Sequence, residues 1–435
     1  MGHTVGKDVY RELGRKIDNL HVRAPWNEAF HEVLKDIYSQ DEADLFVRLP
    51  YLFSSFERIK SLTKLPEAKL RRVLDSLCHK GLVMDVWLDG AYRYMPSPLF
   101  VGVFEFTMMR TQGQLNSKEW GKLFHEYMVE GSPYRSNFAE GYRTSLARAL
   151  PHEESLAEQV EILDYERAEH LIEESTKTAV GLCSCRHKAE HAGEELCEVP
   201  METCTTLGWG ADYLIRNGMS REIDKVEARE IFARSRELGL CFSADNVKKR
   251  LAFICHCCGC CCGIMHGLNQ HGLSSTLVTS SFIAEVDESA CVGCGKCVRA
   301  CPPQAITFAD HPLKDNGGPK KLALLDPEFC VGCGVCGLKC DTGAIKLHKR
   351  KERVIHPETT FERVILQCLE RGTLQNQLFD NPQSLSQKAM RPMLGAFLRL
   401  EPVKQALMSD ALRSTFLKTM SSGIRVLGKG YLHEL

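Results

Sequence analysis

Apolar and polar positions alternate with a helical period over much of residues 1–110. Within 25–40 and again within 65–81, apolar residues recur at spacings of three and four, which predicts two amphipathic helices. Two β-prone runs follow, at 83–88 and 91–95, and an Asp-Gly dipeptide separates them. Because Asp-Gly favours the tight turn of an antiparallel hairpin, the predicted order is helix, helix and β-hairpin.

The helical pattern returns at intervals to the end of the chain. Residues 165–180 and 220–240 read as amphipathic helices, and the cysteine-poor tail contains further helical runs. Together with the changes in cysteine content, these patterns predict an α+β protein of several domains. The predicted parts are a helical N-terminal domain over 1–110, a polar helical connector over 111–165, a cysteine-rich domain over 166–285, a repeat-containing domain over 286–350 and a helical tail over 351–435.

Composition narrows the class of protein. The chain has 435 residues, of which 44% are hydrophobic and 26% charged. These proportions are typical of soluble globular proteins and exclude disorder, collagen-like repeats and coiled coil as the dominant class. The formal net charge is -1, so no overall field attracts the chain to nucleic acid or to an anionic membrane.

Cysteine is unusually frequent, with 21 residues. Only Cys78 and Cys368 lie outside 183–340. Disulfide frameworks spread cysteines to tie distant loops, whereas clumps at short spacing are typical of metal or cluster ligands. No signal peptide is visible at the N-terminus, and no apolar run reaches the roughly 20 residues that a membrane span needs. We therefore expect ligand sets in a reducing, cytoplasmic protein that is not integral to a membrane.

An internal repeat has the most specific spacing. Residues 287–308 (DESACVGCGKCVRACPPQAITF) align with residues 326–347 (DPEFCVGCGVCGLKCDTGAIKL), and each contains C-x2-C-x2-C-x3-C. This spacing is that of bacterial ferredoxins with two [4Fe–4S] clusters, in which one tight loop supplies three thiolates to a cluster. The stretch 286–350 therefore resembles a two-cluster ferredoxin domain.

The resemblance implies a crossed ligand pattern, in which the fourth cysteine of each repeat serves the cluster of the other repeat. One cluster would be held by Cys291, Cys294, Cys297 and Cys340, and the other by Cys330, Cys333, Cys336 and Cys301. Four glycines would let the loops wrap closely around the clusters, and these are Gly293, Gly295, Gly332 and Gly334.

Two features distinguish the second repeat from the family pattern. Pro302 follows the fourth cysteine of the first repeat, as the pattern prescribes, but Asp341 occupies that place in the second. This departure can alter a cluster potential and removes no ligand. The insertion 311–321 lengthens the hairpin between the halves. Two zinc sites are the alternative interpretation, and tandem runs of four cysteines fit it poorly.

The cysteine-rich domain contains a first group of four thiols at Cys183, Cys185, Cys197 and Cys204. This group could hold another cluster or a zinc ion. Arg186, His187 and Lys188 follow the C-x-C pair. Cationic neighbours favour thiolate over thiol and would raise a cluster potential. The alternative is that these side chains are only solvated.

The second group has six thiols, at Cys255, Cys257, Cys258, Cys260, Cys261 and Cys262, beside His256 and His266. One cubane cannot use all of them, and adjacent side chains such as Cys257 and Cys258 diverge. Three interpretations stay open. Part of the group ligates a further [4Fe–4S] cluster, the two groups share two clusters, or the segment holds a non-cubane cluster.

A sequence motif supports the third interpretation, the non-cubane cluster. Cys257-Cys258-Gly259 and Cys261-Cys262-Gly263 each resemble the CCG signature of heterodisulfide-reductase-type domains. With the C-x-C-R motif and the double repeat, the whole chain resembles the multi-cluster 4Fe–4S ferredoxin-type proteins of anaerobic bacteria. Cys78, Cys241 and Cys368 are expected to be core residues, as are the apolar residues of VGVFEFTMMR at 101–110.

The N-terminal order of helices and hairpin resembles a winged helix-turn-helix over about 40–100. The helix at 65–81 has a mild basic excess, which is far from the clustered basic face of a groove-binding helix. The sequence therefore favours protein contact over DNA binding. Nucleotide-binding and hydrolase motifs are absent from the sequence.

These observations predict an iron–sulfur electron-transfer protein. They favour a non-catalytic subunit of an oxidoreductase over a chain that is itself an enzyme. Two [4Fe–4S] clusters are expected in 286–350 and one or two more in 166–285. The expected partner is a redox enzyme or an electron-carrier protein, with oligomer contacts through the winged helix or the C-terminal helices. The alternatives are a redox-sensing winged-helix regulator and a thiol or disulfide reductase that uses a special cluster in the CCG-rich part.

Overall fold

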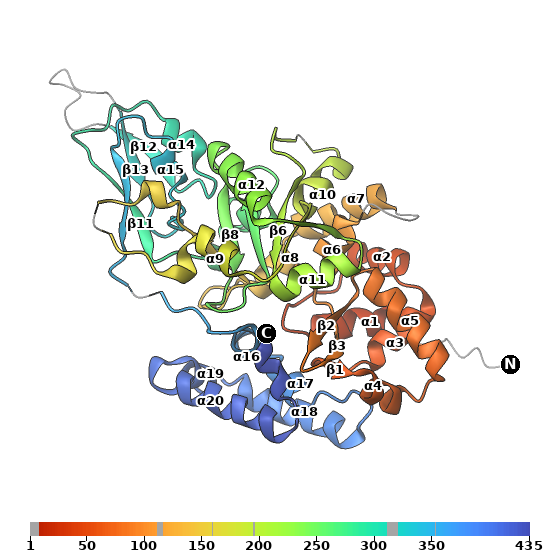
Figure 1. The fold of residues 1–435 in the computed structure, drawn as a ribbon. Coiled ribbons are helices and arrows are strands. Elements are labelled where there is room, and N and C mark those ends of the chain that lie inside the picture. The colour runs from red at the N-terminus through yellow and green to blue at the C-terminus, as the bar shows by residue number, and fades with distance from the viewer. Residues whose placement is uncertain (1–7, 111–115, 159, 195, 311–320, 353) are drawn as a thin grey trace. The chain divides into compact units, whose positions relative to one another are not determined.

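The chain folds into two compact units, which we describe from a computed structural model (Figure 1). The structure describes residues 8–110, 116–158, 160–194, 196–310, 321–352 and 354–435. Unit 1 comprises Met1–Asn137, Tyr213–Met219 and Thr359–Leu435, and unit 2 comprises Phe138–Asp212 and Ser220–Glu358. Unit 1 thus combines the N-terminal part with the tail, and unit 2 combines the cysteine-rich part with the repeat. The finer division into five parts stays a prediction.

Unit 1 begins with helices that lead into a small antiparallel sheet of order β1-β3-β2. Its N-terminal elements are α1 (Val9–Asp18), α2 (Glu28–Ile37), α3 (Gln40–Arg48), β1 (Ser54–Ser55), α4 (Phe56–Thr63), α5 (Glu67–His79), β2 (Val83–Leu88), β3 (Ala91–Pro96), α6 (Phe104–Met109), α7 (Ser117–Val129) and α8 (Ser132–Asn137). The two helices and the hairpin predicted from the sequence are confirmed. Asp89 and Gly90 both have positive φ, as the tight hairpin turn requires.

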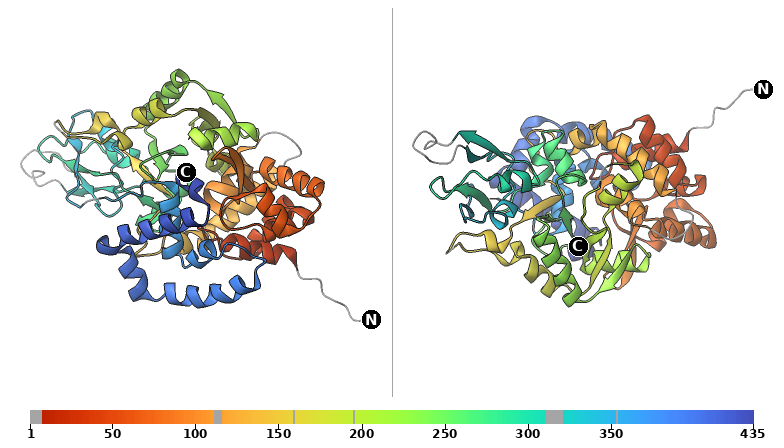
Figure 2. Two further views of the ribbon diagram at one scale, coloured as in Figure 1. Left: turned by 60° about the horizontal axis from the view of Figure 1, so that its bottom comes forward. Right: turned by 90° about the horizontal axis from the view of Figure 1, so that it is seen from above.

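The tail of unit 1 is helical, as predicted, and includes α16 (Thr360–Glu370), α17 (Leu374–Leu378), α18 (Leu385–Leu398), α19 (Glu401–Met408) and α20 (Asp410–Val426). Figure 2 shows these helices in blue, one after another. Asp380 ties the tail to the N-terminal helices, because its buried carboxylate accepts hydrogen bonds from Arg58 at 2.8 Å and from Lys429 at 2.7 Å. Cys78 and Cys368 are buried, which confirms them as core residues, and so are Phe104 and Met108 of the 101–110 segment.

Unit 2 is built on a seven-stranded sheet of order β10-β4-β8-β9-β6-β5-β7. Its strands are β4 (Ala147–Leu150), β5 (Thr178–Leu182), β6 (Glu202–Leu207), β7 (Ser220–Ile223), β8 (Cys241–Asp245), β9 (Phe253–Cys257) and β10 (Leu277–Val278). All neighbouring pairs are antiparallel except β10 and β4. Its helices include α9 (Ala168–Glu174), α10 (Ser184–Ala192), α11 (Gly208–Arg216, which ends in unit 1), α12 (Lys225–Glu237) and α13 (Gly263–Asn269).

Three sequence expectations need correction here. The helix predicted over 220–240 begins only at Lys225, because Ser220–Ile223 form the edge strand β7. The predicted helix over 165–180 is wrong beyond Glu174, where α9 ends and the β-branched residues of β5 enter the sheet. The connector predicted as helical over 111–165 contains α7 and α8, but it also contributes β4 as an interior strand.

The two faces of this sheet differ in chemistry. Phe242, Ala244 and Ile254 belong to the apolar core with Ile172 of α9 and Phe232 of α12. Because side chains alternate along a strand, the residues between them point to the opposite face. That opposite face carries the cysteines of the three neighbouring strands β8, β9 and β6, which are Cys241, Cys255, Cys257 and Cys204.

The repeat forms two small antiparallel sheets, β11 with β14 and β12 with β13. The elements are β11 (Phe282–Val286), α14 (Lys296–Ala300), β12 (Ile306–Asp310), β13 (Lys321–Leu325), α15 (Val335–Leu338) and β14 (Ile345–Lys349). Each cysteine loop precedes one of the short helices. Of the predicted insertion 311–321, all but Lys321 lies outside the described residues.

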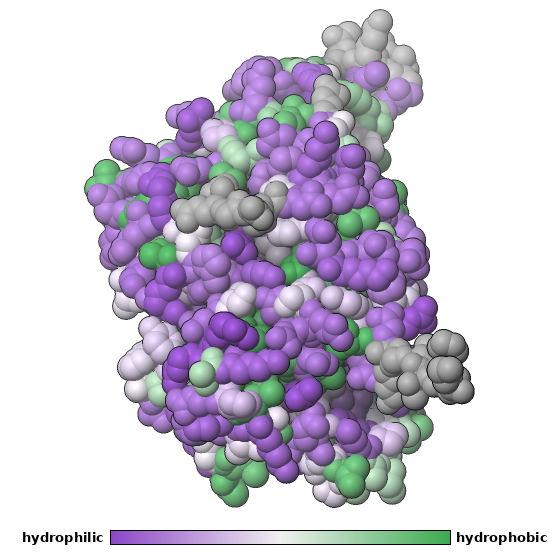
Figure 3. All heavy atoms as spheres, turned by 90° about the vertical axis from the view of Figure 1, so that its right-hand side faces the viewer, coloured by the Kyte–Doolittle hydropathy of each residue, from purple (hydrophilic) through white to green (hydrophobic). Residues whose placement is uncertain are grey.

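Among the described residues, no helix combines the length and the apolar character that crossing a membrane would require. On the face drawn in Figure 3, hydrophobic residues lie scattered among hydrophilic ones.

His356 provides a test of the packing in unit 2. It is buried, and its Nδ1 lies 2.8 Å from Oδ1 of Asn246. Burial, followed by the charges of Arg148 and Lys248, lowers the pKa of His356 from 6.5 to about 3. The unfolded chain therefore binds a proton near pH 6.5 that the folded protein does not bind. The stability from this residue is complete above that pH and is lost as the pH falls towards 3.

We expect the free energy of unfolding to fall by about 1.4 kcal/mol between roughly pH 7.5 and 5.5 because of His356. The variant His356→Gln should show a pH dependence that is smaller by this amount. Anoxic denaturant titrations of both proteins at the two pH values measure the difference. Identical pH dependence of the two proteins would contradict the prediction.

Candidate iron–sulfur centres

The second cysteine loop of the repeat forms a cavity with the remote cysteine of the first. Cys301, Cys330, Cys333 and Cys336 all line this cavity, and its other walls include apolar side chains such as Ala284. Cys330, Cys333 and Cys336 are buried, and Cys301 is half-buried. Four cysteines that line one largely apolar cavity fit a [4Fe–4S] cluster. This is the set expected from the crossed pattern, and we call it the inner set.

The first loop brings together the other four cysteines of the repeat in a more exposed place. Cys291 and Cys297 are buried, but Cys340 is half-buried and Cys294 is exposed. Cys291 and Cys340 are close enough to Cys297 for their charges to raise its pKa, together with burial. We call these four cysteines the outer set. Asp341, where the second repeat departs from the family pattern, forms an ion pair with Lys296 of the first loop.

Glycine is required in both loops. Gly293 and Gly332 have φ values of +68° and +66°, a region that disfavours other residues. A Cβ atom at Gly332 would collide with the carbonyl oxygen of Phe282, and one at Gly293 with that of Lys321. The loops therefore lie directly against neighbouring backbone, as expected for loops that wrap a cluster.

Cys241 lies beside the inner set. It is fully buried on β8, where its thiol lies within hydrogen-bonding reach of the Ser243 hydroxyl at 3.9 Å. The neighbouring Cys333 thiol and then burial raise the pKa of Cys241, whereas Cys241 lowers the pKa of Cys333 against the effect of burial. The sequence indicated only a core residue at this position. Nothing in the spacing of the cysteines shows that β8 meets the second loop.

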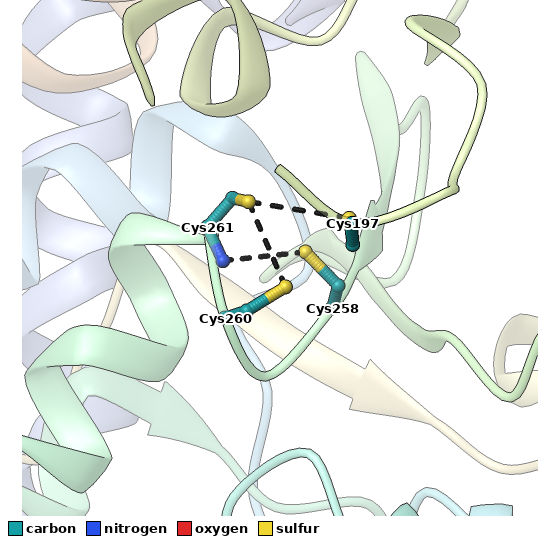
Figure 4. A group of neighbouring side chains, drawn as sticks. All are labelled: Cys197, Cys258, Cys260 and Cys261. Atoms are coloured by element: carbon teal, nitrogen blue, oxygen red, sulfur yellow. Dashed lines mark hydrogen bonds between the residues drawn. The ribbon is translucent and has the colours of Figure 1, made fainter. Parts of the chain in front are cut away.

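A third group of cysteines lies in the cysteine-rich part, at Cys197, Cys258, Cys260 and Cys261 (Figure 4). Their four sulfur atoms all lie within 4.8 Å of one another. The Cys261 sulfur is 3.6 Å from that of Cys260 and 4.0 Å from that of Cys197, and the Cys261 amide donates to the Cys258 sulfur at 3.4 Å. This group, the Cys197 group, can hold a further metal centre.

The electrostatics of the Cys197 group favour one thiolate. That thiolate is Cys258. The hydrogen bond between Cys258 and Cys261 and the charge of Arg186 lower the pKa of Cys258 to about 4, although burial acts in the opposite direction. Burial and then the charge of Cys258 raise the pKa of Cys260 to about 12. A thiolate at neutral pH is the form that binds metal.

Arg186 and Lys188 are buried, so the alternative interpretation, that these side chains are only solvated, does not hold for these two residues. The Arg186 guanidinium donates to Thr203 Oγ1 at 2.6 Å and to the His256 carbonyl oxygen at 2.8 Å. Lys188 pairs with Glu194 at 2.9 Å. A buried guanidinium whose oxygen partners are neutral stabilises negative charge on nearby sulfur.

The remaining predicted ligands of the cysteine-rich part do not belong to the Cys197 group, and these are Cys183, Cys185, Cys204, Cys255, Cys257 and Cys262. The Cys185 sulfur accepts a hydrogen bond from the amide of Gly263 at 3.4 Å. The sequence grouped Cys197 with Cys183, Cys185 and Cys204, and the structure separates it from them.

Both histidines of the cysteine-rich part have ring nitrogens within hydrogen-bonding distance of other protein groups. His256 lies on the apolar face of the sheet, where its ring nitrogens meet Ser235 Oγ at 2.7 Å and Thr205 Oγ1 at 3.2 Å. Nε2 of His266 lies 2.6 Å from the carbonyl oxygen of Cys260.

The loop between β9 and α13, which carries the two CCG motifs and which we call the CCG loop, packs directly on the repeat. A Cβ atom at Gly259 would lie 3.2 Å from the carbonyl oxygen of Pro302, the residue after Cys301. Asn269 of α13 donates to the same oxygen at 3.0 Å. The glycine thus brings the loop with Cys258 and Cys260 next to a cysteine of the inner set.

Comparison with known proteins agrees with part of this description. Residues 290–358 match the model of a family described as 4Fe-4S dicluster domain. No curated protein and no solved structure matches the chain. The dicluster domain implies two [4Fe–4S] clusters, and the fold around it is α+β with a cysteine-rich middle region.

The buried Cys241 thiol beside Cys333 yields a test, since a thiol in this place can donate to a cluster sulfur. Hydrogen bonds to cluster sulfurs raise the reduction potential, because they stabilise the more negative reduced state. We expect Cys241→Val to lower the potential of one cluster by up to about 60 mV, the one-electron equivalent of roughly 1.4 kcal/mol.

An EPR-monitored redox titration of the anoxic protein measures this shift. Cys78→Val is the matched control, because Cys78 is an equally buried thiol on α5 of unit 1. Its cluster potentials should equal those of the unsubstituted protein. A shift of the same size in both variants would contradict the role given to Cys241.

Proposed function

We propose that this chain transfers electrons through several [4Fe–4S] clusters, to or from a redox enzyme or an electron-carrier protein. The observation that carries the proposal is the cavity in which Cys301 meets Cys330, Cys333 and Cys336. The match to the dicluster family supports two one-electron carriers in the repeat. The Cys197 group adds a third centre, for which we propose a further [4Fe–4S] cluster.

The arrangement of the sites supports a route for electrons within unit 2. The outer set includes the exposed Cys294, which lets an external partner approach its cluster closely. Three cysteines of the inner set are buried, and the set lies next to the middle part. Gly259 lies against Pro302, and Cys241 of β8 is a neighbour of Cys333. Electrons would therefore pass between solvent and the middle part by way of the inner set.

The winged-helix-like part of unit 1 is better suited to protein contact than to DNA. Basic residues of α5 and its end are already engaged, since Lys69 pairs with Asp41 at 2.8 Å and Lys80 with Glu42 at 2.8 Å. The β2–β3 hairpin exposes Trp87, which is 55% accessible. An exposed aromatic side chain and neutralised basic residues favour a protein partner.

The tail helices offer a second contact surface. Several large apolar side chains are exposed on α18 and α20 and in the segments that follow them, namely Leu385, Met393, Phe397, Leu400, Leu412, Val426 and Leu427. Exposed apolar residues in this number are typical of interaction surfaces. We propose that the tail and the winged-helix-like part hold the redox partner or a second subunit.

Metal analysis of variants tests the proposal. The anoxically purified and reconstituted chain should contain at least about 12 iron atoms and as many sulfides, from the two clusters of the repeat and one at the Cys197 group. Cys301→Ala should remove or alter the inner cluster alone, and Cys340→Ala the outer cluster alone. Cys258→Ala should lower the iron content by about four atoms and leave both ferredoxin signals intact.

Cys368→Ala is the control, because Cys368 is a buried thiol of the tail helix α16. Its iron content should equal that of the unsubstituted protein. Less than about eight iron atoms per chain would refute electron transfer through the repeat. One zinc ion that is lost in Cys258→Ala, with iron unchanged, would refute the third cluster.

A further inference from the structure

One arginine holds the loop of the inner set against a neighbouring strand. Arg350 directly follows β14, and its amide donates to the carbonyl oxygen of Ser281 at 2.9 Å. Its guanidinium donates through Nε to the carbonyl oxygen of Phe282 at 3.0 Å and through Nη2 to that of Cys330. Because Cys330 belongs to the inner set, Arg350 connects the beginning of β11 with an expected ligand of the inner cluster.

A second contact ties the same loop to the same segment without any charge. Ser280 donates its amide to the carbonyl oxygen of Val331 at 3.0 Å and its hydroxyl to that of Gly332 at 2.8 Å. Ser280 is fully buried. The loop is thus anchored by a neutral side chain at one point and by a cation at another. This pair of anchors allows the effect of charge to be separated from the effect of anchoring.

The positive charge of Arg350 is not neutralised where the side chain contacts the loop. Both groups that accept hydrogen bonds from its guanidinium are backbone carbonyl oxygens, which carry no net charge. Arg350 is half-buried, whereas Glu352, two residues further along the chain, is exposed, so water screens the charge of this carboxylate. A guanidinium also stays protonated throughout the pH range of proteins, so the charge is permanent.

The cations near the outer set have a different environment. Arg299 donates to the carbonyl oxygen of Cys294 at 3.4 Å, but Arg299 is exposed. Lys296 is exposed as well and forms an ion pair with Asp341. Charges in water are screened more strongly than charges at the edge of the protein interior. Of these three cations, Arg350 is therefore expected to act most strongly on the cluster next to it.

Burial of the inner set gives this charge a role. Reduction adds one negative charge to a cluster, and an apolar site disfavours added charge. Three cysteines of the inner set are buried, so burial alone would lower the reduction potential of the inner cluster relative to a cluster beside the exposed Cys294. A half-buried cation acts in the opposite direction, because it stabilises the more negative, reduced state.

We infer that Arg350 is a positioning residue of the inner cluster, which holds the Cys330 loop in place and raises the reduction potential of that cluster by its charge. The inference rests on the proposed function and adds a determinant of how readily the inner cluster accepts an electron. Because Arg350 offsets the effect of burial, it brings the potential of the inner cluster closer to that of the outer cluster. An electron can then pass between the two clusters in either direction.

EPR-monitored redox titrations of the anoxic, reconstituted full chain test the inference. The inner signal is identified first, as the one that Cys301→Ala alters. Arg350→Gln should lower the inner potential so that the equilibrium constant for reduction falls about tenfold, which corresponds to about 59 mV for one electron. Arg350→Met, a second uncharged variant, should show the same fall. Arg350→Lys should retain most of the inner potential, because the ammonium keeps the positive charge although the planar fork is lost.

Ser280→Ala is the matched control, because it removes the neutral anchor of the same loop and should leave the inner potential unchanged. Arg299→Gln is the control for an exposed cation, and it should shift the outer potential less than Arg350→Gln shifts the inner one. Equal shifts in Arg350→Gln and Ser280→Ala would overturn the inference, because anchoring alone would then explain them. An inner potential that is as low in Arg350→Lys as in Arg350→Gln, or unchanged in both uncharged variants, would overturn it too. Absence of both ferredoxin signals from the unsubstituted chain would instead refute the proposed function.

Discussion

A loop with C-x2-C-x2-C spacing directs three sulfurs to one centre, and the fourth has to come from another segment. In this chain the fourth sulfur of the inner set comes from the other repeat, because Cys301 faces the same cavity as Cys330, Cys333 and Cys336. This crossing obliges the two repeats to fold as one body. It also fixes Pro302, and with it the contact to Gly259 of the CCG loop. The position of the middle cysteines relative to the repeat thus depends on where the remote ligand lies.

The structure could be predicted from the sequence wherever it depends on residues that are close together in the chain. The helices around 25–40 and 65–81 and the hairpin after them follow from apolar spacing and from one turn dipeptide, and the structure contains α2, α5, β2 and β3 at those places. The ferredoxin repeat was recognisable because its ligands are set by local spacing. The role of Gly293 and Gly332 could be predicted for the same reason, because their positive φ is a property of the loop itself.

What the sequence could not supply depends on long-range pairing. The segment 165–180 has helical periodicity throughout, but β5 takes its last residues because strand pairing with β6 and β7 outweighs local preference. In the same way, Cys197 is close in sequence to Cys204 and close in space to Cys261. Cys241 is a neighbour of Cys333, which is almost a hundred residues away in the sequence, and no local sequence pattern predicts this proximity.

The unequal exposure of the two loops of the repeat has a further consequence. Dioxygen arrives from solvent, and the loop with the exposed Cys294 meets it before the loop with the buried Cys333. Oxidative damage to the protein therefore proceeds from the surface inwards. A briefly aerated sample would therefore lose a cluster at the outer set before it lost one at the inner set.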